Sequence, residues 1–296
     1  MKQHTINNSF TLSGKGLHTG LFINASFLPA EPDTGICIRR VDLAGKPCFE
    51  AVADYVTNTA RGTVLQNGEW GVSTIEHTLS ALYSLNIDNC IIEIDAPEMP
   101  ILDGSAKLIV ESLLKAGIKE QPAEQKTLVI NKNISHESGN SKIDIQPFDR
   151  FCVEVNIEFP SPILNKQTAS LNSLDDYISE ISAARTFVFV REVLPLLQMG
   201  LIKGGDLQNA IVIYDQQMSQ QDFDKLATQL QQPTQDASKL RYLCDLHFDN
   251  EPARHKLLDI IGDLALVGRH IQGKVIATCP GHGINTAFAK KLKELL

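Results

Sequence analysis

Two stretches far apart in the chain share a helical pattern with apolar residues on one side and polar residues on the other. In the segment 252–268 the apolar residues recur at helical spacing and leave four polar residues together on the opposite face: His255, Lys256, Asp259 and Asp263. In the segment 74–85 the apolar stripe consists of Ile75, Leu79, Leu82 and Leu85. His77 points nearly opposite this stripe. Both segments are therefore predicted to be helices that bury one face.

The remaining pattern predicts strands and helices in an order that is loosely repeated. Apolar runs and alternations predict strands at 6–12, 22–27, 36–40, 90–94, 128–134, 142–146, 151–159, 210–214 and 273–277. Further helices are predicted over 174–184 and from Asp103 or Ser105 to about Ala116, where Gly117 ends the helix. We expect an α+β fold whose two halves arose by duplication.

The boundary between two domains is predicted at 121–125, a polar stretch that contains a proline. The N-terminal domain spans 1–123 and contains the helix at 74–85. The C-terminal domain spans 124–296 and contains the helix at 252–268. A chain of 296 residues is long enough for two ordinary domains.

Two segments of the second half interrupt this order. Residues 187–205 are unusually apolar for a connection and end in Lys203-Gly204-Gly205. They either belong to the core or form an inserted flap that offers an apolar channel to a ligand. Residues 216–240 are rich in Gln, Asp and Ser, which predicts a surface helix or a mobile loop without chemistry of its own.

The polar residues of the two amphipathic helices are of the types found in hydrolytic zinc sites. His255 and Asp259 are four residues apart, so their side chains lie one above the other and can reach one metal ion. With His77 they make three protein ligands, the number that catalytic zinc commonly takes beside one water. The neighbouring Glu76 is then left to accept a proton from that water.

Each of these residues also has a simpler interpretation. Taken alone, the spacing of His255 and Asp259 is equally typical of an ion pair on a solvated helix face. Ser73-x-x-Glu76 fits a capping box, in which the glutamate only satisfies a backbone N–H. A lone His77 is more often structural than catalytic. The combination of all four favours the metal site.

Composition narrows the class of protein. Hydrophobic residues make up 43% of the chain and charged residues 21%, as in ordinary globular proteins. The net charge of −8 leaves no broad basic surface for nucleic acid or an anionic membrane. The apolar runs are shorter than a bilayer span, and Met1–Thr5 has no apolar signal-peptide region. The six cysteines are scattered singly, which predicts a reduced, cytoplasmic protein without thiolate zinc ligands.

Six motifs follow one another between residues 14 and 282. They are Gly14-Lys15-Gly16-Leu17-His18-Thr19-Gly20, Ser73-Thr74-Ile75-Glu76-His77, Pro97-Glu98-Met99-Pro100-Ile101-Leu102-Asp103-Gly104-Ser105, Ala184-Arg185-Thr186-Phe187, Arg254-His255-Lys256-Leu257-Leu258-Asp259-Ile260-Ile261-Gly262-Asp263-Leu264 and Gly281-His282. In kind and order this set resembles the UDP-3-O-acyl-N-acetylglucosamine deacetylases, zinc amidases of lipid A biosynthesis in Gram-negative bacteria. Each motif alone is modest, but the set is highly specific.

The resemblance implies a fold and a set of catalytic roles. The expected fold consists of two α/β sandwich domains of similar topology, with helices packed between sheets and the active site at the domain interface. His77, His255 and Asp259 become the zinc ligands. Glu76 becomes the general base and His282 the general acid.

The resemblance also implies roles for residues around the metal. Thr186 is similar to a family threonine that helps to polarise the amide carbonyl, and Asp263 lies beside the site. Lys256 and His18 are expected near the uridine diphosphate. The segment 187–205 matches a family insert that surrounds the fatty acyl chain. Its expected contacts with that chain are Phe187, Phe189, Leu197 and Gly205.

The expected function is zinc-dependent hydrolysis of the N-acetyl group of UDP-3-O-(3-hydroxyacyl)-N-acetylglucosamine, which gives acetate and the free 2-amino sugar nucleotide. The expected partner is this acylated UDP-sugar, and the chain is expected to act as a monomer. The ligand set by itself also allows another zinc amidase or a peptidase. A binding protein with a structural zinc is the weaker alternative, because the sequence offers no fourth ligand. In some bacteria the family enzyme is fused to a downstream dehydratase domain.

Overall fold

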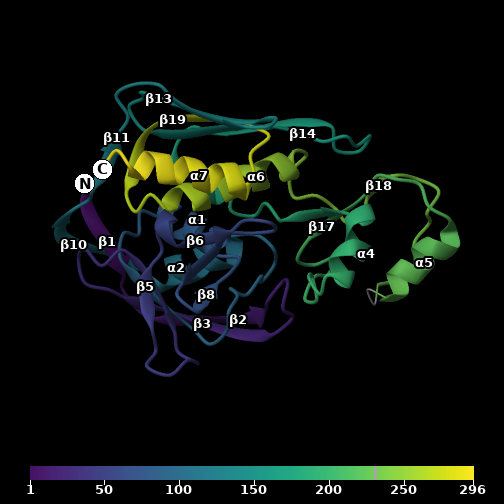
Figure 1. The fold of residues 1–296 in the computed structure, drawn as a ribbon, viewed down its shortest axis with the longest axis horizontal. Coiled ribbons are helices and arrows are strands. Elements are labelled where there is room, and N and C mark those ends of the chain that lie inside the picture. Colours follow the sequence, from purple (N-terminus) through teal and green to yellow (C-terminus); the bar gives the residue numbers. More distant parts are fainter. Residues whose placement is uncertain (230–231) are drawn as a thin grey trace.

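The fold consists of helices packed between two larger sheets. The computed structural model describes residues 1–229 and 232–296, and Figure 1 shows one sheet at the bottom of the view and another at the top. Between them lie the helices α1 (Glu76–Ser84), α2 (Lys107–Ala116), α6 (Glu251–Ala265) and α7 (His282–Lys293). The predicted α+β fold with helices between sheets is confirmed.

The lower sheet is built from the first half of the chain. Its strands, in spatial order, are β2 (Phe10–Lys15), β3 (Phe22–Pro29), β9 (Cys90–Ile94), β4 (Ile36–Arg40) and β5 (Cys48–Glu50). The central strand β9 pairs antiparallel with β3 and parallel with β4. Alternate residues of β9, namely Cys90, Ile92 and Ile94, are completely buried. The period of two therefore gives the sheet an apolar face toward the helices.

The upper sheet is built from the second half of the chain. Its strands, in spatial order, are β12 (Ile134–Ser138), β13 (Ser141–Gln146), β19 (His270–Thr278), β14 (Phe151–Glu158) and β15 (Lys166–Leu171), and β11 (Thr127–Val129) also pairs with β19. The central strand β19 pairs antiparallel with β13 and parallel with β14. Ile271, Val275 and Ala277 of β19 are buried against the helices.

The two sheets have the same strand order and the same strand directions. In each half, a helix precedes the central strand in the chain, α1 before β9 and α6 before β19. These two equivalent helices pack directly on each other. A Cβ atom added at Gly262 of α6 would lie only 2.0 Å from the carbonyl oxygen of Glu76 in α1. This shared topology fits the expected duplication, and it places the N-terminus of α1 against the middle of α6.

A smaller unit projects from the side of the layers, at the right of Figure 1. It contains a sheet of β16 (Phe187–Phe189), β17 (Ile211–Tyr214) and β18 (Arg241–Tyr242) with the helices α4 (Val190–Gln198) and α5 (Gln220–Gln229). Some of its apolar residues, among them Val193, Val212 and Phe223, form a cluster distinct from the main core. Phe189, Ile211 and Ile213 of its sheet belong to the main core. The segment 187–205 is thus a strand, a helix and a loop that contribute to both cores. Positions 230–231 of the predicted surface segment lie outside the described residues.

The strand predicted at 6–12 has wrong bounds, and the polar stretch 121–125, where the domain boundary was placed, has regular structure. Most of this stretch belongs to β10 (Ile118–Glu124), which pairs with β1 (Lys2–Ile6). Gln121 is buried there and accepts a hydrogen bond from Asn89 Nδ2 at 2.8 Å. The predicted strand 6–12 is split between the end of β1 and the start of β2. The pairing of β1 with β10 therefore determines the structure here, and the proline in 121–125 does not end the strand.

Three predictions in the second half need correction. The predicted strand 128–134 is interrupted, since β11 ends at Val129 and β12 begins at Ile134. The predicted helix 174–184 shrinks to the 3₁₀ turn η2 (Leu174–Asp176) and the short α3 (Tyr177–Glu180). No helix was predicted after 252–268, yet His282 begins the helix α7.

The helix predicted to end at Ala116 is confirmed at that end, and it begins at Lys107, two residues after Ser105. Ser105 Oγ accepts a hydrogen bond from the Lys107 backbone N–H at 3.1 Å, and Gly117 follows the last residue with a positive φ of 81°. The remaining elements of the first half are the 3₁₀ turn η1 (Ala53–Tyr55) and a small sheet of β6 (Val56–Asn58), β7 (Val64–Asn67) and β8 (Trp70–Val72). Within the described ranges, every helix is too short or too polar to cross a lipid bilayer.

Candidate active site

Three side chains from the two equivalent helices converge at the crossing of α1 and α6. His77 comes from the first turn of α1, and His255 and Asp259 come from successive turns of α6. The His77 and His255 rings lie edge to face, with 5.0 Å between their centroids. Asp259 Oδ1 lies 3.8 Å from His77 Nε2 and 3.4 Å from His255 Nε2. One ligand atom from each residue lies within 4.8 Å of the other two.

The chemistry of this cluster fits a metal ion. All three side chains are at most 6% exposed, and Asp259 Oδ1 has no hydrogen-bond partner among the described residues. An unsatisfied buried carboxylate oxygen between two imidazoles is costly unless a cation binds there. His255 Nδ1 lies 3.0 Å from the carbonyl oxygen of Ala184, which fixes the ring and leaves Nε2 directed at the cluster. Two imidazole nitrogens and a carboxylate are a donor set that suits zinc.

Glu76 is buried beside the cluster and does not cap its own helix. The capping-box interpretation is wrong, because Ile75 precedes α1 without any side-chain cap and Ser73 Oγ instead donates to the carbonyl of Pro97. Glu76 Oε2 accepts a hydrogen bond from the Thr63 backbone N–H at 3.0 Å. Burial raises the pKa of Glu76 to about 7, with the charged His282 opposing and the Asp263 and Asp259 carboxylates reinforcing the shift.

His282 faces the cluster from the first turn of α7. Its Nδ1 lies 2.9 Å from Asp263 Oδ2, and its Nε2 lies 3.8 Å from Glu76 Oε1 and 3.9 Å from Asp259 Oδ2. Burial alone lowers the pKa of this imidazole, but the neighbouring carboxylates, Asp263 foremost, raise it to about 9. Asn285, one turn further along α7, also donates to Asp263 Oδ2 at 2.9 Å.

Lys256 and the aromatic ring of Phe187 form another side of the site. Lys256 Nζ donates to Asp259 Oδ2 at 2.8 Å and lies 5.4 Å from the centroid of the Phe187 ring. Together with His255, His282 and His77, this ammonium group holds the pKa of Asp259 below its usual range, although burial acts in the opposite direction. The backbone N–H of Thr186 donates to the Gly104 carbonyl at 2.8 Å.

These residues line a pocket of about 500 Å³ between the two halves. The lining includes all three predicted metal ligands, together with Glu76, His282, Lys256, Thr186 and Phe187. Both halves of the chain contribute the other lining residues, which include Leu17, Thr59, Ala60, Arg61, Thr74, Ser138, Phe159, Cys279 and Ile284. The site therefore exists only where the halves meet.

Four of the predicted substrate contacts lie elsewhere. His18 is half-buried, and its Nε2 lies 3.3 Å from the carbonyl oxygen of Arg61, a residue that does line the pocket. Gly205 lines a neighbouring apolar cavity, and Leu197 packs on the small core of the projecting unit. Phe189 is buried in the main core and stacks under Arg191. The sequence alone could not show that these four residues lie outside the pocket, because they stand in the same apolar or Gly-rich stretches as residues that do line it.

Two polar residues that hold the site were missed. Thr63 Oγ1 donates to Asp263 Oδ1 at 2.5 Å, and its N–H donates to Glu76. Asn285 holds the other oxygen of Asp263. Asn285 follows His282 by three residues, so a helical period after Gly281 is the signal that could have found it. Thr63 lies in a loop and has no such signal.

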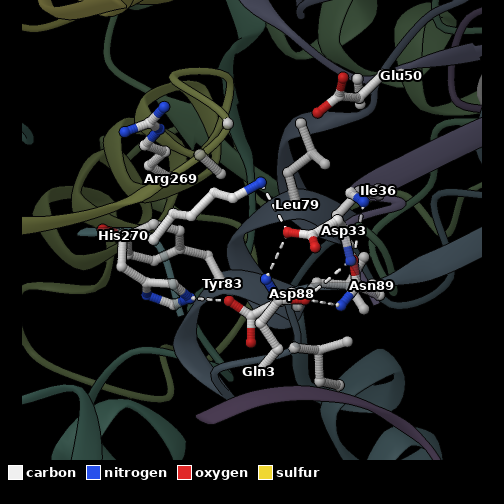
Figure 2. A pocket seen from close by; sticks show the side chains of 17 residues that line it. Gln3, Asp33, Ile36, Glu50, Leu79, Tyr83, Asp88, Asn89, Arg269 and His270 are labelled. Atoms are coloured by element: carbon white, nitrogen blue, oxygen red, sulfur yellow. Dashed lines mark hydrogen bonds and ion pairs between the residues drawn. The ribbon is translucent and has the colours of Figure 1, made fainter. Parts of the chain in front are cut away.

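A second hollow of about 100 Å³ lies near the C-terminal ends of α1 and α6. Figure 2 shows Tyr83, Asp88 and His270 side by side in it, with Asp33 and Asn89 opposite. None of the predicted site residues lines this hollow in the described part of the chain. The polar side chains of this hollow connect the first half of the chain to β19, and we assign them a structural role.

The chain matches the sequence profile described as UDP-3-O-acyl N-acetylglycosamine deacetylase over residues 3–227 and 237–294. It belongs to this family. The match covers every residue of the metal cluster and leaves out residues 228–236. The family resemblance seen in the sequence motifs is thereby confirmed.

Curated relatives of the family align with nearly the whole chain. It is 50% identical over 297 residues to the "Bifunctional enzyme LpxC/FabZ" of Porphyromonas gingivalis and 49% identical over 298 residues to that of Bacteroides thetaiotaomicron. The alignments cover 99% of this chain but only 64% and 65% of those two relatives. The "UDP-3-O-acyl-N-acetylglucosamine deacetylase" of Citrifermentans bemidjiense is 38% identical over 291 residues, which cover 98% of this chain and 88% of the relative.

Proposed function

We propose that this chain removes the N-acetyl group from UDP-3-O-(3-hydroxyacyl)-N-acetylglucosamine and releases acetate and the free 2-amino sugar nucleotide. The observation that carries the proposal is the meeting of the His77, His255 and Asp259 ligand atoms within 4.8 Å, with Glu76 and His282 lining the same pocket 3.8 Å from each other. Family membership supplies the substrate class and the step in lipid A biosynthesis.

In this proposal His77, His255 and Asp259 hold one zinc ion. Bound zinc polarises the amide carbonyl and lowers the pKa of a water from about 16 to about 7. Lys256 donates to the second oxygen of Asp259 and leaves Oδ1, which has no partner among the described residues, as the oxygen that would bind the metal. The three protein ligands leave a fourth position for a small molecule, as in other catalytic sites.

Glu76 is the general base of the proposed reaction. Its Oε2 is held by the Thr63 N–H, while Oε1 is the oxygen nearer to His282. A pKa of about 7 suits a carboxylate that must accept a proton from water at neutral pH and later release it. Burial in the crossing of the two helices is what moves the pKa of this glutamate into that range.

His282 is the general acid. With a pKa of about 9 the imidazole carries its proton at neutral pH. Asp263 holds Nδ1, so the proton on Nε2 is the one directed into the pocket and toward the departing amine nitrogen. Thr63 and Asn285 occupy the two oxygens of Asp263, which fixes this carboxylate as a positioning group.

The remaining polar groups stabilise charge on the substrate. Thr186 is half-buried in the wall of the pocket that contains the metal cluster, and in this proposal its hydroxyl donates to the oxyanion of the amide. Lys256 and Arg61 are cationic pocket residues that suit a diphosphate. His18 stays a predicted contact at the rim, next to Arg61.

The proposal is tested by acetate release from the acylated UDP-sugar with the purified protein. A chelator should abolish release and added zinc should restore it, and elemental analysis should find one zinc per chain. His255→Ala should lose the metal, whereas His136→Ala, a change in strand β12 outside the pocket, should keep it. Full zinc content in His255→Ala, or chelator-resistant turnover, contradicts the ligand assignment. Equal hydrolysis of unrelated amides would favour a different amidase.

Two further parts of the proposal concern the state of the protein. We expect a monomer, and the scattered cysteines indicate a cytoplasmic location. Light scattering coupled to gel filtration measures the first, and fractionation of expressing cells measures the second. A stable dimer or a membrane-bound fraction would contradict these expectations without affecting the chemistry.

A further inference from the structure

A buried ion pair joins the N-terminus of α6 to the segment that leads into β16. Its partners, Arg185 and Glu251, are 7% and 0% exposed. Arg185 Nε donates to Glu251 Oε1 at 2.9 Å, and Nη2 donates to Oε2 at 3.1 Å. The backbone N–H of Arg185 donates to Oε1 at 3.0 Å, and the backbone N–H of His247 donates to Oε2 at 2.6 Å. Both oxygens of one carboxylate are thus satisfied by four donors.

The surroundings of the pair keep it ionised and fixed. Burial raises the pKa of Glu251, but the hydrogen bonds from Arg185 and from the His247 backbone outweigh burial, and the pKa lies below its usual value. Arg185 Nη2 also donates to the Asp245 carbonyl at 2.7 Å. A buried ion pair offsets its lost hydration only when its geometry is good and its other polar groups have partners. Both conditions hold here, so the pair is a fixed point of the structure.

Glu251 stands in the same row of α6 as the residues of the active site. It is the first residue of the helix, and His255, Asp259 and Asp263 follow it at intervals of four. Side chains four residues apart in a helix lie one above the other. All four side chains are at most 2% exposed. The ion pair therefore lies one helical turn from His255, the first metal ligand that this helix supplies.

Arg185 stands between two residues that serve the active site. The Ala184 carbonyl oxygen lies 3.0 Å from His255 Nδ1, and Ala184 is completely buried. Thr186 lines the active-site pocket, and its backbone N–H donates to the Gly104 carbonyl of the first half at 2.8 Å. Arg185 therefore ties to α6 the segment whose neighbouring residues contact a metal ligand on one side and form the pocket wall on the other.

We propose that Arg185 and Glu251 are positioning residues for the zinc site: their ion pair fixes the Ala184 carbonyl against His255, so that Nε2 of this ring stays directed at the metal, and keeps Thr186 in the pocket wall. The inference rests on the zinc-dependent activity proposed above. A group that holds the second ring nitrogen of a metal-bound histidine sets the tautomer and orientation of the ring, and losing its support lowers metal affinity by about 10- to 100-fold. An ion pair that only stabilised the fold would leave the zinc affinity of the folded protein unchanged.

The experiment measures zinc affinity by competition with a coloured chelator, well below the melting temperature of each variant. Removing one partner leaves a buried charge unpaired and risks unfolding, so the main variant combines Arg185→Met with Glu251→Gln. It should bind zinc about 10- to 100-fold more weakly than the wild type. Arg185→Lys keeps the charge but lacks the forked pair of donors, so it should also lose affinity. The matched control combines Arg39→Met with Glu93→Gln, which removes a 2.9 Å ion pair outside the active-site pocket and should leave zinc affinity unchanged.

Two further measurements report the position of the groups rather than the stability of the fold. Protein loaded with Co²⁺ in place of zinc has visible absorption bands that depend on the geometry of the ligands. These bands should change in the Arg185→Met/Glu251→Gln variant and stay unchanged in the control. At saturating zinc, kcat of this variant should fall while KM changes little, because Thr186 acts on the reacting amide rather than on substrate binding.

Weaker zinc binding and altered Co²⁺ bands in a folded Arg185→Met/Glu251→Gln variant support the inference. Unchanged affinity and unchanged bands overturn it and leave the ion pair with a structural role alone. If this variant does not fold, the same measurements on Arg185→Lys decide in the same way. If the wild type binds zinc and releases acetate while the variants bind zinc equally well, only this inference fails. If the wild type binds no zinc, the proposed function fails as well.

Discussion

At the scale of single residues, the candidate site depends on which polar groups are buried and what they face. Glu76 and His77 are adjacent in the chain but have separate environments. His77 is directed at Asp259, whereas Glu76 is held by the Thr63 N–H and faces His282. His77 is therefore assigned to metal binding and Glu76 to proton transfer.

Glu76→Gln should keep zinc and lose rate. The amide retains the size of the side chain but cannot accept a proton, so kcat should fall by about 10²- to 10⁴-fold, the usual range for a general base. The measurement pairs kcat with zinc content. Glu69→Gln, at an exposed position, is the control and should behave as the wild type. Metal loss in Glu76→Gln would make Glu76 a ligand instead.

His282→Gln should also retain zinc and lower kcat by about 10²- to 10⁴-fold, because it removes the proton donor for the leaving amine. An activated substrate whose leaving group needs no proton should be affected much less by this change. Comparing the two substrates in the variant and the wild type separates proton donation from a general structural effect. Similar losses on both substrates would show that His282 is not the acid.

At the scale of elements, the site is created by the contact between α1 and α6. Gly262 permits this contact, since a Cβ atom there would meet the Glu76 carbonyl oxygen at 2.0 Å. The three ligand atoms come from these two helices, so a change in their separation moves His77 away from His255 and Asp259. Element packing is therefore directly coupled to metal binding.

Gly262→Ala should destabilise the protein and weaken zinc binding together. Alanine normally stabilises a helix interior relative to glycine by about 1 kcal/mol, but here overpacking should cost about 1–3 kcal/mol. Gly283→Ala in α7 is the matched control, since its Cβ atom has only an ordinary contact at 3.5 Å. Urea unfolding and zinc titration of both variants test this. A Gly262→Ala protein as stable as the control would contradict the close-packing argument.

At the scale of the whole molecule, the two halves are joined away from the active site by buried titratable groups. His270 of β19 stacks on Tyr83 of α1 with 4.7 Å between ring centroids, and its Nε2 lies 3.5 Å from Asp88 Oδ1 (Figure 2). Burial, with His4 nearby, lowers the pKa of His270 to about 4. Burial also raises the pKa of Asp88.

The lowered pKa of His270 should make the fold acid-sensitive. The unfolded chain binds a proton at this histidine from pH 6.5 downward, whereas the folded chain does so only near pH 4. Stability that is present above pH 6.5 is therefore lost as the pH falls toward 4, by about 2 kcal/mol between pH 7 and pH 5. The raised pKa of Asp88 acts with the opposite sign. Urea unfolding of the wild type and of His270→Gln at both pH values isolates the histidine. Equal pH dependence in the two proteins would refute this contribution.

The division of the chain into domains 1–123 and 124–296 remains our proposal. Each part contains a complete sheet of the shared topology, and β1 and β10 pair at the edge of the first part. Limited proteolysis should first cut near residues 125–126, between β10 and β11. First cuts inside either sheet would contradict the boundary.

The local pattern of the sequence was sufficient for the central strands, the amphipathic helices and the relation of His255 to Asp259. Strands 36–40 and 90–94 were predicted with their observed bounds, and α6 differs from its prediction by one residue at the start and three at the end. These features depend on short-range periodicity, which each segment carries by itself. The family motifs added the roles of residues far apart in the chain.

Only the tertiary structure decided which distant groups meet. It pairs His282 with Asp263, brings Thr63 to Glu76 and buries Gln121 in a strand within the polar stretch where the domain boundary was predicted. It also starts α7 at His282 and assembles α4 and α5 around a second small core. The three hydrogen bonds join residues 13, 19 and 32 positions apart. The burial that raises the pKa of Glu76 and the carboxylates that raise the pKa of His282 come together only when the two halves close over them. Local periodicity contains no information about such closure, because it specifies which face of an element is apolar but not which element will cover it.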